Sequence, residues 1–420
     1  MSDLKTIRGM PDLYGKDIEA ISMIEKTCKE VFLAFNYSEI RTPLIEYKSL
    51  FERSVGESSE IIQQKEVFEL DDRKGEMLCL RPEGTAGLVR SLITNGLDDE
   101  EIKKFFYIGP MFRYERPQKG RKRQFFQAGV ELIGNAIYGD LEVIQVANMI
   151  LDKLGIESNL EINFLGDNES LKAYNKYLDD YLSRSNEVPE YVKKNPIRAL
   201  DSKDEKVKIL MSEAKSIESF LNEKQKNKFS DIKNKLNELN INFEENKNLV
   251  RGLDYYNCLV FEFTSSELGA QNAIIGGGRY DGLIESLGGR NLPATGFALG
   301  IDRLSEIIKS SLLRKDIFIG CVDESSVPYA QKIGSQLRGT NSELVIENYL
   351  GSANVSKQLK KANSQGFKFA IIVGQEEIKA EKVKLKYLKD DKYILNEYLI
   401  PSLECSKYLL HLVNDILTYA

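Results

Sequence analysis

The chain has 420 residues, of which 42% are hydrophobic and 29% charged, and its net charge is −6. This length exceeds one ordinary core, so we expect two or three domains, and the acidic balance excludes a globally basic nucleic-acid binder without excluding a local basic site. No apolar run is long enough to span a bilayer, and the N-terminal MSDLKTIRGMPDLYG lacks an apolar signal-peptide core, so the expected compartment is the cytoplasm.

Two kinds of chemistry are disfavoured by the cysteine and histidine content. The five cysteines are widely spaced with no CxxC pair, and the only histidine is His411. A zinc site needs clustered thiolates and imidazoles, and a catalytic triad needs a positioned histidine. The sequence therefore predicts no structural metal site and no histidine-based nucleophilic mechanism.

The N-terminal part is predicted to alternate between helices and strands. Apolar residues at helical spacing predict a helix over 17–36, and 38–46 is predicted to be a strand. Pro43 cannot donate to a ladder, so this strand belongs at an edge or where the sheet meets something other than its own strand. A short hairpin is expected around 71–75, followed by a helix over 85–96 with Thr85 as its N-cap.

An antiparallel pair follows, formed by 104–115 and 123–134 around the loop RPQKGRK. Between Arg113 and Arg123 the chain has seven charged residues, six of them basic. Alternation in the second strand places Phe126, Ala128, Val130 and Leu132 on one face, and Gln127, Gly129 and Glu131 on the other. The pattern thus puts polar side chains on one face of a strand whose other face is apolar.

The remaining segments predict an insertion and a separate C-terminal domain. A helix is expected over about 140–154, and charged amphipathic helices without glycine occupy 170–248. Strands resume at 249–265 and 270–278, and 296–311 passes from a glycine-spaced strand into a helix. The last hundred residues repeat strand and helix and end in a predicted C-terminal helix, which is typical of a small α/β domain.

Several short motifs suggest chemistry, and each has a purely structural alternative. The basic loop 116–122 could hold phosphates or be a solvated turn. RPEGT (81–85) could be a ligand-binding turn or a helix cap. RGLDYY (251–256) places Arg251 in a predicted buried strand, where an unpaired charge is costly, unless Arg251 lies at a solvated strand start.

Two glycine-rich motifs are weaker signals. GGGRYDG (276–282) fits neither common glycine-rich phosphate motif. In GFALGIDRL, Gly296 and Gly300 allow close approach of a flat ligand, and Arg303 lies at a helix start that favours phosphate. The alternative for GFALGIDRL is a tight strand-to-helix packing corner.

In their order, three segments resemble motifs 1, 2 and 3 of the class II aminoacyl-tRNA synthetases. They are the proline-bearing segment 38–46 after the long helix, FRYER with its basic loop and return strand, and the glycine-spaced strand that leads to GIDRL. RPEGT, ERPQKGR, RGLDYY and GGGRYDGL look specifically like the histidyl-tRNA synthetase family, and IRGMPD and NPIRALDSK also fit. The resemblance covers essentially the whole chain. The chain departs from the family at Tyr114 and Phe126, where histidines are frequent, and at Asp302, where glutamate is usual.

The resemblance implies an α+β catalytic domain with an antiparallel sheet flanked by helices (1–169 and 249–312). It also implies a helical insertion (170–248) and a C-terminal α/β anticodon-binding domain (316–420). The implied function is histidine–tRNA ligase: L-histidine reacts with ATP to histidyl-adenylate and pyrophosphate, and histidine is then transferred to the 3′ end of tRNA(His). Mg²⁺ would bridge the leaving phosphates, and the protein would be a homodimer through its motif 1 segment.

The resemblance also implies residue roles. Arg113 and Arg251 would be the catalytic cations at the ATP α-phosphate, Glu115 would lie near the adenine, and Arg303 would hold the γ-phosphate. For histidine, Glu83 and Thr85 are implied to bind the α-amino group, with Gly84 between them. Arg113 and Gln127 would lie at the carboxylate, with Arg251 beside it. Glu131 and Tyr256 would bind the imidazole, and Tyr255 and Tyr280 would line the pocket. The implied contacts to the tRNA acceptor end are Arg116, Gln118, Lys119 and Arg121.

Other readings are a catalytically inactive regulatory paralogue of histidine biosynthesis, a tRNA-sensing module and a class II synthetase for another amino acid. The regulatory paralogue should lack the C-terminal domain or have an eroded RGLDYY. This chain has a C-terminal domain and an intact RGLDYY. A sensing module would be fused to a kinase, for which the chain has no segment of sufficient length. RGLDYY disfavours another amino acid.

Overall fold

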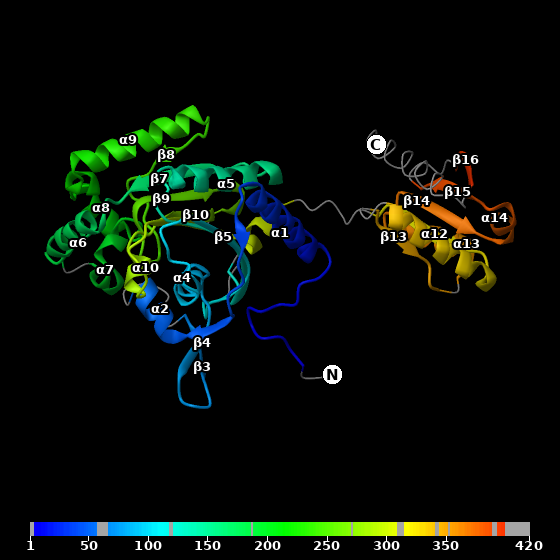
Figure 1. Cartoon of the computed structure of the whole chain (residues 1–420), viewed down its shortest axis with the longest axis horizontal. Coiled ribbons are helices and arrows are strands. Elements are labelled where there is room, and N and C mark those ends of the chain that lie inside the picture. Colours follow the sequence, from blue (N-terminus) through cyan, green and yellow to red (C-terminus); the bar gives the residue numbers. More distant parts are fainter. Residues whose placement is uncertain are drawn as a thin grey trace. The chain divides into compact units, whose positions relative to one another are not determined.

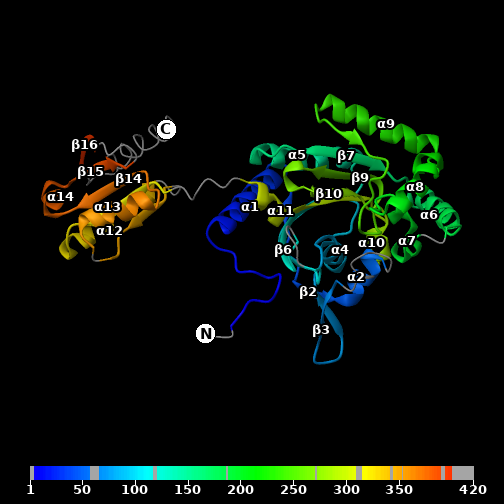
Figure 2. The ribbon, with the colours of Figure 1, turned by 180° about the vertical axis from the view of Figure 1, so that it is seen from behind.

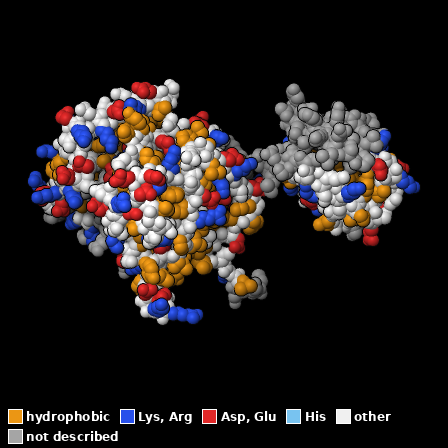
Figure 3. Space-filling model, in the orientation of Figure 1, with side chains coloured by type: hydrophobic (Ala, Val, Ile, Leu, Met, Phe, Trp, Pro, Cys, Tyr) orange, Lys and Arg blue, Asp and Glu red, His pale blue; other side chains and the backbone are white. Residues whose placement is uncertain are grey.

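The computed structural model describes residues 4–56, 66–116, 121–185, 188–269, 272–308, 315–340, 344–351, 353–388 and 393–399. The chain divides into two compact units, Met1–Ser310 and Ser311–Ala420 (Figure 1). Acidic and basic side chains are interspersed over the visible face of the first unit, without a large field of one sign (Figure 3). Among the described residues, no helix combines the length and the apolar character that crossing a membrane requires.

The first unit is built on an eight-stranded sheet with the order β1-β5-β6-β11-β10-β9-β7-β8. Its neighbouring strands are antiparallel except at the two edges, where β1 pairs with β5 and β8 with β7 in parallel. The predicted flanked antiparallel sheet is therefore confirmed. The strands are β1 Ser38–Glu39, β5 Lys103–Phe112, β6 Gln124–Ile133, β7 Asn159–Phe164, β8 Glu244–Glu245, β9 Asn257–Thr264, β10 Ala273–Arg279 and β11 Ala294–Gly300.

The helices α1 (Lys16–Ala34), α5 (Gly139–Leu154) and α11 (Ile301–Ile307) pack against one face of this sheet (Figure 2). Ala128, Val130 and Leu132 of β6 are buried in the core that these helices share with the sheet, and Phe126 packs against it. The opposite face is partly covered by α4 (Thr85–Thr94) and α10 (Leu283–Ser286). The predicted alternation of β6 is confirmed, and its polar residues face the less covered side.

The predicted strand over 38–46 is wrong. β1 ends at Glu39, and β2 (Ile45–Tyr47) belongs to a separate three-stranded sheet with the order β2-β4-β3. Pro43 lies between the two strands, where its missing N–H interrupts no ladder. The predicted hairpin is confirmed as β3 (Phe68–Asp71) and β4 (Met77–Leu80), and α2 (Lys48–Val55) follows β2.

Short helices form the segment between β7 and β8. They are α6 Asn168–Leu182, α7 Glu190–Lys194, η1 Pro196–Ala199, α8 Glu205–Glu213, η2 Ile217–Phe220 and α9 Glu223–Glu238. Tyr174, Leu178 and Val207 form a cluster that also includes Leu249 and Val260. This segment therefore packs directly onto the region where the main sheet resumes. A one-turn helix η3 (Ser266–Leu268) links β9 to β10.

The second unit is an α/β domain around a five-stranded sheet with the order β13-β12-β14-β15-β16, which confirms the predicted class. β12 pairs in parallel with β13 and β14, and the remaining pairs are antiparallel. The predicted C-terminal helix lies outside the described residues. The elements are β12 Ile317–Cys321, η4 Glu324–Ser326, α12 Val327–Thr340, β13 Ile346–Asn348, α13 Val355–Ser364, β14 Phe369–Val373, α14 Gln375–Ala380, β15 Lys382–Tyr387 and β16 Tyr393–Leu399.

A buried ion pair ties the main sheet to α5. The Arg279 guanidinium at the end of β10 lies 2.9 Å from Asp140 Oδ1, and Arg279 Nε donates to Asp140 Oδ2 at 3.2 Å. The two side chains are only 7% and 4% exposed. We predict that Asp140→Ala lowers the free energy of unfolding by about 3 kcal/mol, because it leaves a buried guanidinium without its main partner.

Denaturant unfolding measures this effect. The control is Lys26→Ala, which removes an ion pair on the surface of α1 whose side chains are 75% and 55% exposed, and which should change stability by less than about 1 kcal/mol. Equal effects of the two substitutions would contradict a special role for the buried pair.

Candidate active site

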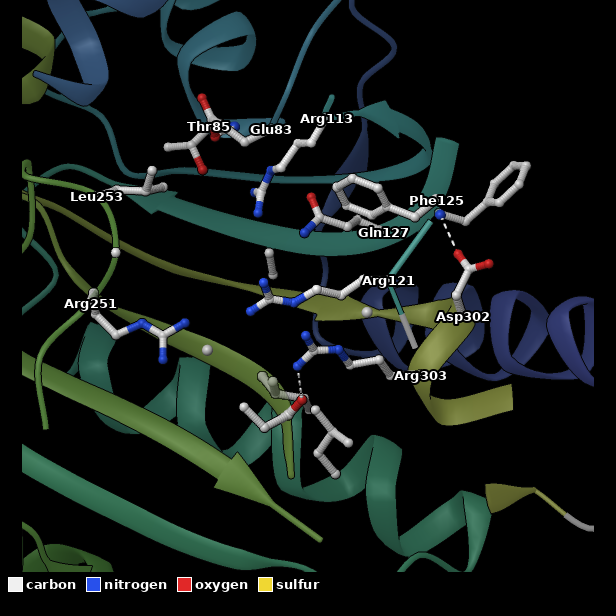
Figure 4. A pocket seen from close by; sticks show the side chains of 18 of the residues that line it. Glu83, Thr85, Arg113, Arg121, Phe125, Gln127, Arg251, Leu253, Asp302 and Arg303 are labelled. Carbon is white, nitrogen blue, oxygen red and sulfur yellow. Dashed lines mark hydrogen bonds between the residues drawn. The ribbon is translucent and has the colours of Figure 1, made fainter. Parts of the chain in front are cut away.

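A pocket of about 480 Å³ opens on the less covered face of the main sheet. The turn before α4, the strands β5, β6, β9 and β10, the segment before β9 and the start of α11 all contribute side chains (Figure 4). Most of the predicted site residues line it, although they come from distant parts of the sequence. These lining residues are Glu83, Thr85, Arg113, Glu115, Arg121, Gln127, Arg251, Tyr255, Tyr256 and Arg303.

The other predicted residues lie elsewhere. Gly84, Glu131 and Tyr280 are directly behind the pocket wall, where Glu131 contacts Thr85 and Tyr280. Arg116 is exposed at the end of the described part of the basic loop. Gln118 and Lys119 lie outside the described residues.

The RPEGT turn is held by its own glutamate. Glu83 is 4% exposed, and its carboxylate accepts hydrogen bonds from the backbone N–H of Thr85 at 2.6 Å and of Ala86 at 2.8 Å. The predicted N-cap Thr85 is wrong, because Gly84 is the N-cap and Thr85 is the first helical residue. The Thr85 hydroxyl is therefore free to turn toward the sheet. Burial raises the pKa of Glu83, although these hydrogen bonds oppose the shift.

Glu131 is a carboxylate in the middle of the main sheet, and it is 1% exposed. It accepts hydrogen bonds from the Thr85 hydroxyl and the Tyr280 hydroxyl, each at 2.6 Å. Gly296 on the neighbouring strand β11 leaves room for it, since a Cβ at that position would overlap Glu131 Oε2. Burial raises the pKa of Glu131 to about 8.

Four arginine side chains point into the pocket from separate segments (Figure 4). Arg113 Nε donates to the Pro82 carbonyl at 3.0 Å, and Arg303 Nη1 donates to the Ala273 carbonyl at 2.8 Å. Arg121 lies 3.2 Å from Glu115, and Arg251 pairs with Glu262 of β9. These contacts fix the four guanidinium groups around one space, which suits a polyanion.

The prediction that Arg251 lies in a buried strand is wrong. β9 begins only at Asn257, and residues 251–256 form an irregular segment. Gly252 and Asp254 favour turns, and the Asp254 N–H donates to the Val55 carbonyl of α2 instead of to a strand. The Arg251 side chain is 20% exposed, so its charge is stabilised by Glu262 rather than by water alone.

Tyrosines close one end of the pocket. The rings of Tyr255 and Tyr256 are 4.8 Å apart, and the Tyr255 ring is 5.7 Å from that of Tyr280. Burial raises the pKa of all three phenols, so each hydroxyl keeps its proton at neutral pH.

Sequence reasoning missed several lining residues, among them Phe125, Tyr107 and Glu262. Phe125 of β6 presents its ring 5.2 Å from the Arg113 guanidinium, Tyr107 of β5 lies in the pocket floor, and Glu262 holds Arg251. Glu262 is a charged residue inside the apolar run LVFEFT, which is the same signal that singled out Glu131. Phe125 and Tyr107 are indistinguishable from core aromatic residues by pattern alone.

Asp302, where the family usually has glutamate, has a specific structural use. Its carboxylate accepts a hydrogen bond from the Phe126 N–H at 2.5 Å and lies 2.8 Å from Lys122 Nζ. It is 5% exposed. The shorter side chain therefore joins the start of α11 to the start of β6 beside the pocket.

Comparison with known proteins agrees with this architecture. The family described as histidyl-tRNA synthetase matches residues 9–304, and an anticodon-binding domain family matches residues 316–395. The histidine–tRNA ligase of Hydrogenovibrio crunogenus is 38% identical over 401 residues, which cover 93% of this chain and 94% of that protein.

Solved structures are also similar. The apo histidyl-tRNA synthetase of S. aureus is 30% identical, with a TM-score of 0.77 over 96% of this chain and 99% of that one. The enzyme of Nostoc sp. is 19% identical and supports the fold alone, with a TM-score of 0.73 over 97% of this chain and 100% of that one. With its sequence matched along nearly its whole length, this chain belongs to the histidyl-tRNA synthetase family.

The raised pKa of Glu131 predicts a pH-dependent stability. An unfolded glutamate loses its proton near its ordinary pKa of 4.5, whereas folded Glu131 keeps it until about pH 8. The contribution of Glu131 is therefore fully present below about pH 4.5 and is lost as the pH rises to about 8. Relative to Glu131→Gln, which does not titrate, the wild type should lose stability over this range.

Chemical unfolding across the pH series provides the measurement. Glu30→Gln on the surface of α1, where the side chain is 55% exposed, is the control and should follow the wild type. A constant difference between wild type and Glu131→Gln at every pH would show that Glu131 titrates normally.

Proposed function

We propose that this chain is a histidine–tRNA ligase. It activates L-histidine with ATP to histidyl-adenylate and pyrophosphate, and then transfers histidine to the 3′ end of tRNA(His). The observation that carries this proposal is one pocket in which Arg113, Arg251 and Arg303 lie opposite an end lined by Glu83, Tyr255 and Tyr256, with Glu131 directly behind the wall of that end. One end suits phosphates and the other suits a small cationic amino acid.

At the amino-acid end, Glu83 and Thr85 would bind the α-amino group and Gln127 would lie near the carboxylate. Glu131 and Tyr256 would bind the imidazole, with Tyr255 and Tyr280 beside it. Glu131 already accepts two hydrogen bonds behind the pocket wall. Each of its oxygens keeps a further lone pair, which could accept an imidazole N–H.

At the phosphate end, Arg113 would contact the α-phosphate and the histidine carboxylate, and Arg303 the γ-phosphate. Glu115 would lie near the adenine, and the face of the Phe125 ring offers a stacking surface for that base. Arg251 would lie beside the α-phosphate. Its Nη1 donates to Glu262, whereas its Nε has no hydrogen-bond partner among the described residues and could donate to a phosphate oxygen.

The reaction needs little proton transfer. The histidine carboxylate attacks the α-phosphorus, the bond to the bridging oxygen breaks, and pyrophosphate leaves. Catalysis then depends on positioning and on the fixed guanidinium charges around the α-phosphate. In the second step the 3′-terminal ribose hydroxyl of tRNA attacks the carbonyl carbon of the adenylate, and AMP leaves.

Mg²⁺ fits this pocket as a companion of the phosphates. The described residues contain no group of three acidic, histidine or cysteine side chains placed to hold a metal ion, whereas Mg²⁺ usually needs only one or two carboxylates besides substrate phosphates. Glu262 lines the pocket beside Arg251 and is the carboxylate that would hold Mg²⁺. When bound, it would neutralise charge on the leaving phosphates.

Contacts with tRNA are proposed for three regions. The loop 116–122, including Arg116, Gln118, Lys119 and Arg121, would meet the acceptor end, and the helical insertion 170–248 would approach the acceptor arm. The C-terminal domain, 316–420, would bind the anticodon stem-loop. The division of the first unit into a catalytic part (1–169 and 249–312) and this insertion also stays a prediction.

We also propose a homodimer in the cytoplasm. Apolar side chains are grouped on the three-stranded sheet and are between 40% and 53% exposed, namely Ile45, Tyr47, Leu70 and Met77 (Figure 3). One strand of this sheet, β2, lies at the end of the proline-bearing segment 38–46, which resembles motif 1, the segment that the family uses between subunits. A second copy of the chain would cover these side chains.

The alternative, an inactive regulatory protein of histidine biosynthesis, has less support. The RGLDYY segment forms part of the pocket wall, and the described part of the C-terminal unit is a five-stranded sheet with helices. An eroded paralogue would need neither feature.

ATP–pyrophosphate exchange with each amino acid in turn tests the proposed function. Histidine should support exchange, and phenylalanine should not, although its ring has a similar size. A site built to hydrogen-bond the imidazole leaves buried polar groups unpaired with phenylalanine, and similar sites discriminate by about 10⁴–10⁵. Lack of exchange with histidine in the wild type would favour the regulatory reading.

Arg251→Ala should reduce histidine-dependent exchange by about 10²–10³, because it removes a fixed cation at developing charge. Histidine binding and folding should largely survive. Arg290→Ala, at an exposed position before β11 and away from the pocket, is the control and should exchange normally. Near-normal exchange by Arg251→Ala would remove Arg251 from the catalytic role.

Deletion of 316–420 should leave histidine-dependent exchange measurable but sharply reduce charging of tRNA. All pocket residues belong to the first unit, and the second unit has its own core. Exchange, tRNA charging and oligomeric state should be measured together on the truncated chain. Unimpaired charging would contradict an anticodon-binding role for the deleted domain.

A further inference from the structure

Tyr107 occupies a fixed place in the pocket floor. It lies on β5 directly opposite Gly129 of β6, and it lines the pocket. A Cβ at Gly84 would overlap the Tyr107 ring, and a Cβ at Gly129 would lie 2.6 Å from the Tyr107 hydroxyl oxygen. Two glycines, one in the RPEGT turn and one in β6, thus provide the space for this ring and leave it little freedom to move.

The Tyr107 hydroxyl is a buried polar group that makes no hydrogen bond of ordinary geometry with the described residues, although the Thr85 side chain lies close enough to act on its pKa. The residue is 5% exposed. Its hydroxyl lies over Gly129, between Gln127 and Glu131 on the same face of β6. Gln127 Oε1 is also buried without a hydrogen-bond partner. Buried polar atoms in proteins are nearly always satisfied, so two neighbouring exceptions in one pocket indicate a ligand.

The surroundings favour a cationic donor for these two atoms. Gln127 Oε1 can only accept a hydrogen bond, and a phenol oxygen can accept one as well. Both oxygens of Glu83 and one of Glu131 are engaged by the Thr85 hydroxyl or by backbone N–H groups at the same end of the pocket. Glu83, and Glu131 once it has lost its proton, also act electrostatically on the Tyr107 hydroxyl. An ammonium group supplies three N–H donors and suits such an environment, whereas a carboxylate would be repelled.

We propose that the Tyr107 hydroxyl, together with Gln127 Oε1, accepts a hydrogen bond from the α-ammonium group of the substrate amino acid. This inference rests on the proposed function and adds a binding residue to it. Gln127 can bind the α-ammonium group and the carboxylate of the substrate together, because its Nε2 remains available as a donor to the carboxylate. Tyr107 distinguishes an amino acid from an otherwise identical acid that lacks the amine.

Tyr107→Phe in the full-length chain isolates the hydroxyl. The ring still fills the space between the two glycines, and an unpaired hydroxyl is removed, so the free energy of unfolding should not fall. The Michaelis constant for histidine in ATP–pyrophosphate exchange should rise by about tenfold to a hundredfold, as expected for a hydrogen bond to a charged group. The Michaelis constant for ATP should stay unchanged.

Two inhibitors separate an ammonium contact from a general change in the pocket. Histidinol keeps the ammonium group, and imidazolepropionate lacks it. Tyr107→Phe should weaken inhibition by histidinol as strongly as it weakens histidine, and should leave imidazolepropionate inhibition unchanged. Equal weakening of both inhibitors, or of neither, would overturn the proposal.

Tyr174→Phe is a matched control. Tyr174 is also fully buried with an unpaired hydroxyl, but it lies in the cluster of the helical segment and not in the pocket. It should behave like the wild type with all three ligands. If the wild type shows no histidine-dependent exchange, the proposed function fails and this inference falls with it. If the wild type exchanges and Tyr107→Phe equals it, only the inference on Tyr107 fails.

Discussion

The alternation of side chains along β6 is the constraint on which the rest of the structure depends. Successive residues of a strand face opposite sides of the sheet, so one run of sequence must build both a sealed core and a polar floor. Ala128, Val130 and Leu132 pack under the helices, while Gln127, Gly129 and Glu131 lie on the opposite face, where Gln127 lines the pocket and Glu131 lies behind its wall. A shift of one residue in pairing would exchange these faces and destroy both.

The polar floor exists only because its neighbours are small. Gly296 makes room for the Glu131 carboxylate, Gly129 makes room for the Tyr107 hydroxyl, and Gly276 lies under the Arg251 guanidinium. These glycines belong to three different strands of the sheet. Their common role is to let large polar groups lie close to the backbone while remaining shielded from water. This explains why the glycine-rich segments of the sequence match no phosphate-binding loop: they form strands.

Much of this arrangement could be predicted from the sequence. The two faces of β6, the hairpin around the basic loop and the grouping of RPEGT with RGLDYY followed from periodicity and from resemblance to the family. The predictions failed where tertiary contacts outweigh local pattern. Residues 249–256 have strand-like composition, but Asp254 bonds to α2 and Arg251 to Glu262, so no ladder forms. By pattern alone Tyr107 resembles a core residue, because Gly84 and Gly129, which leave room for its ring, lie 23 and 22 positions away in the sequence.

The pairing of Arg251 with Glu262 and of Arg121 with Glu115 has a consequence for ligand entry. Each cation is already neutralised by a tethered carboxylate, which acts as an intramolecular competitor at high effective concentration. A single inorganic anion gains little by displacing one of these carboxylates. A chain of linked phosphates displaces several at once and benefits from its own multivalency. Such a pocket would therefore favour a chain of linked phosphates over a single phosphate.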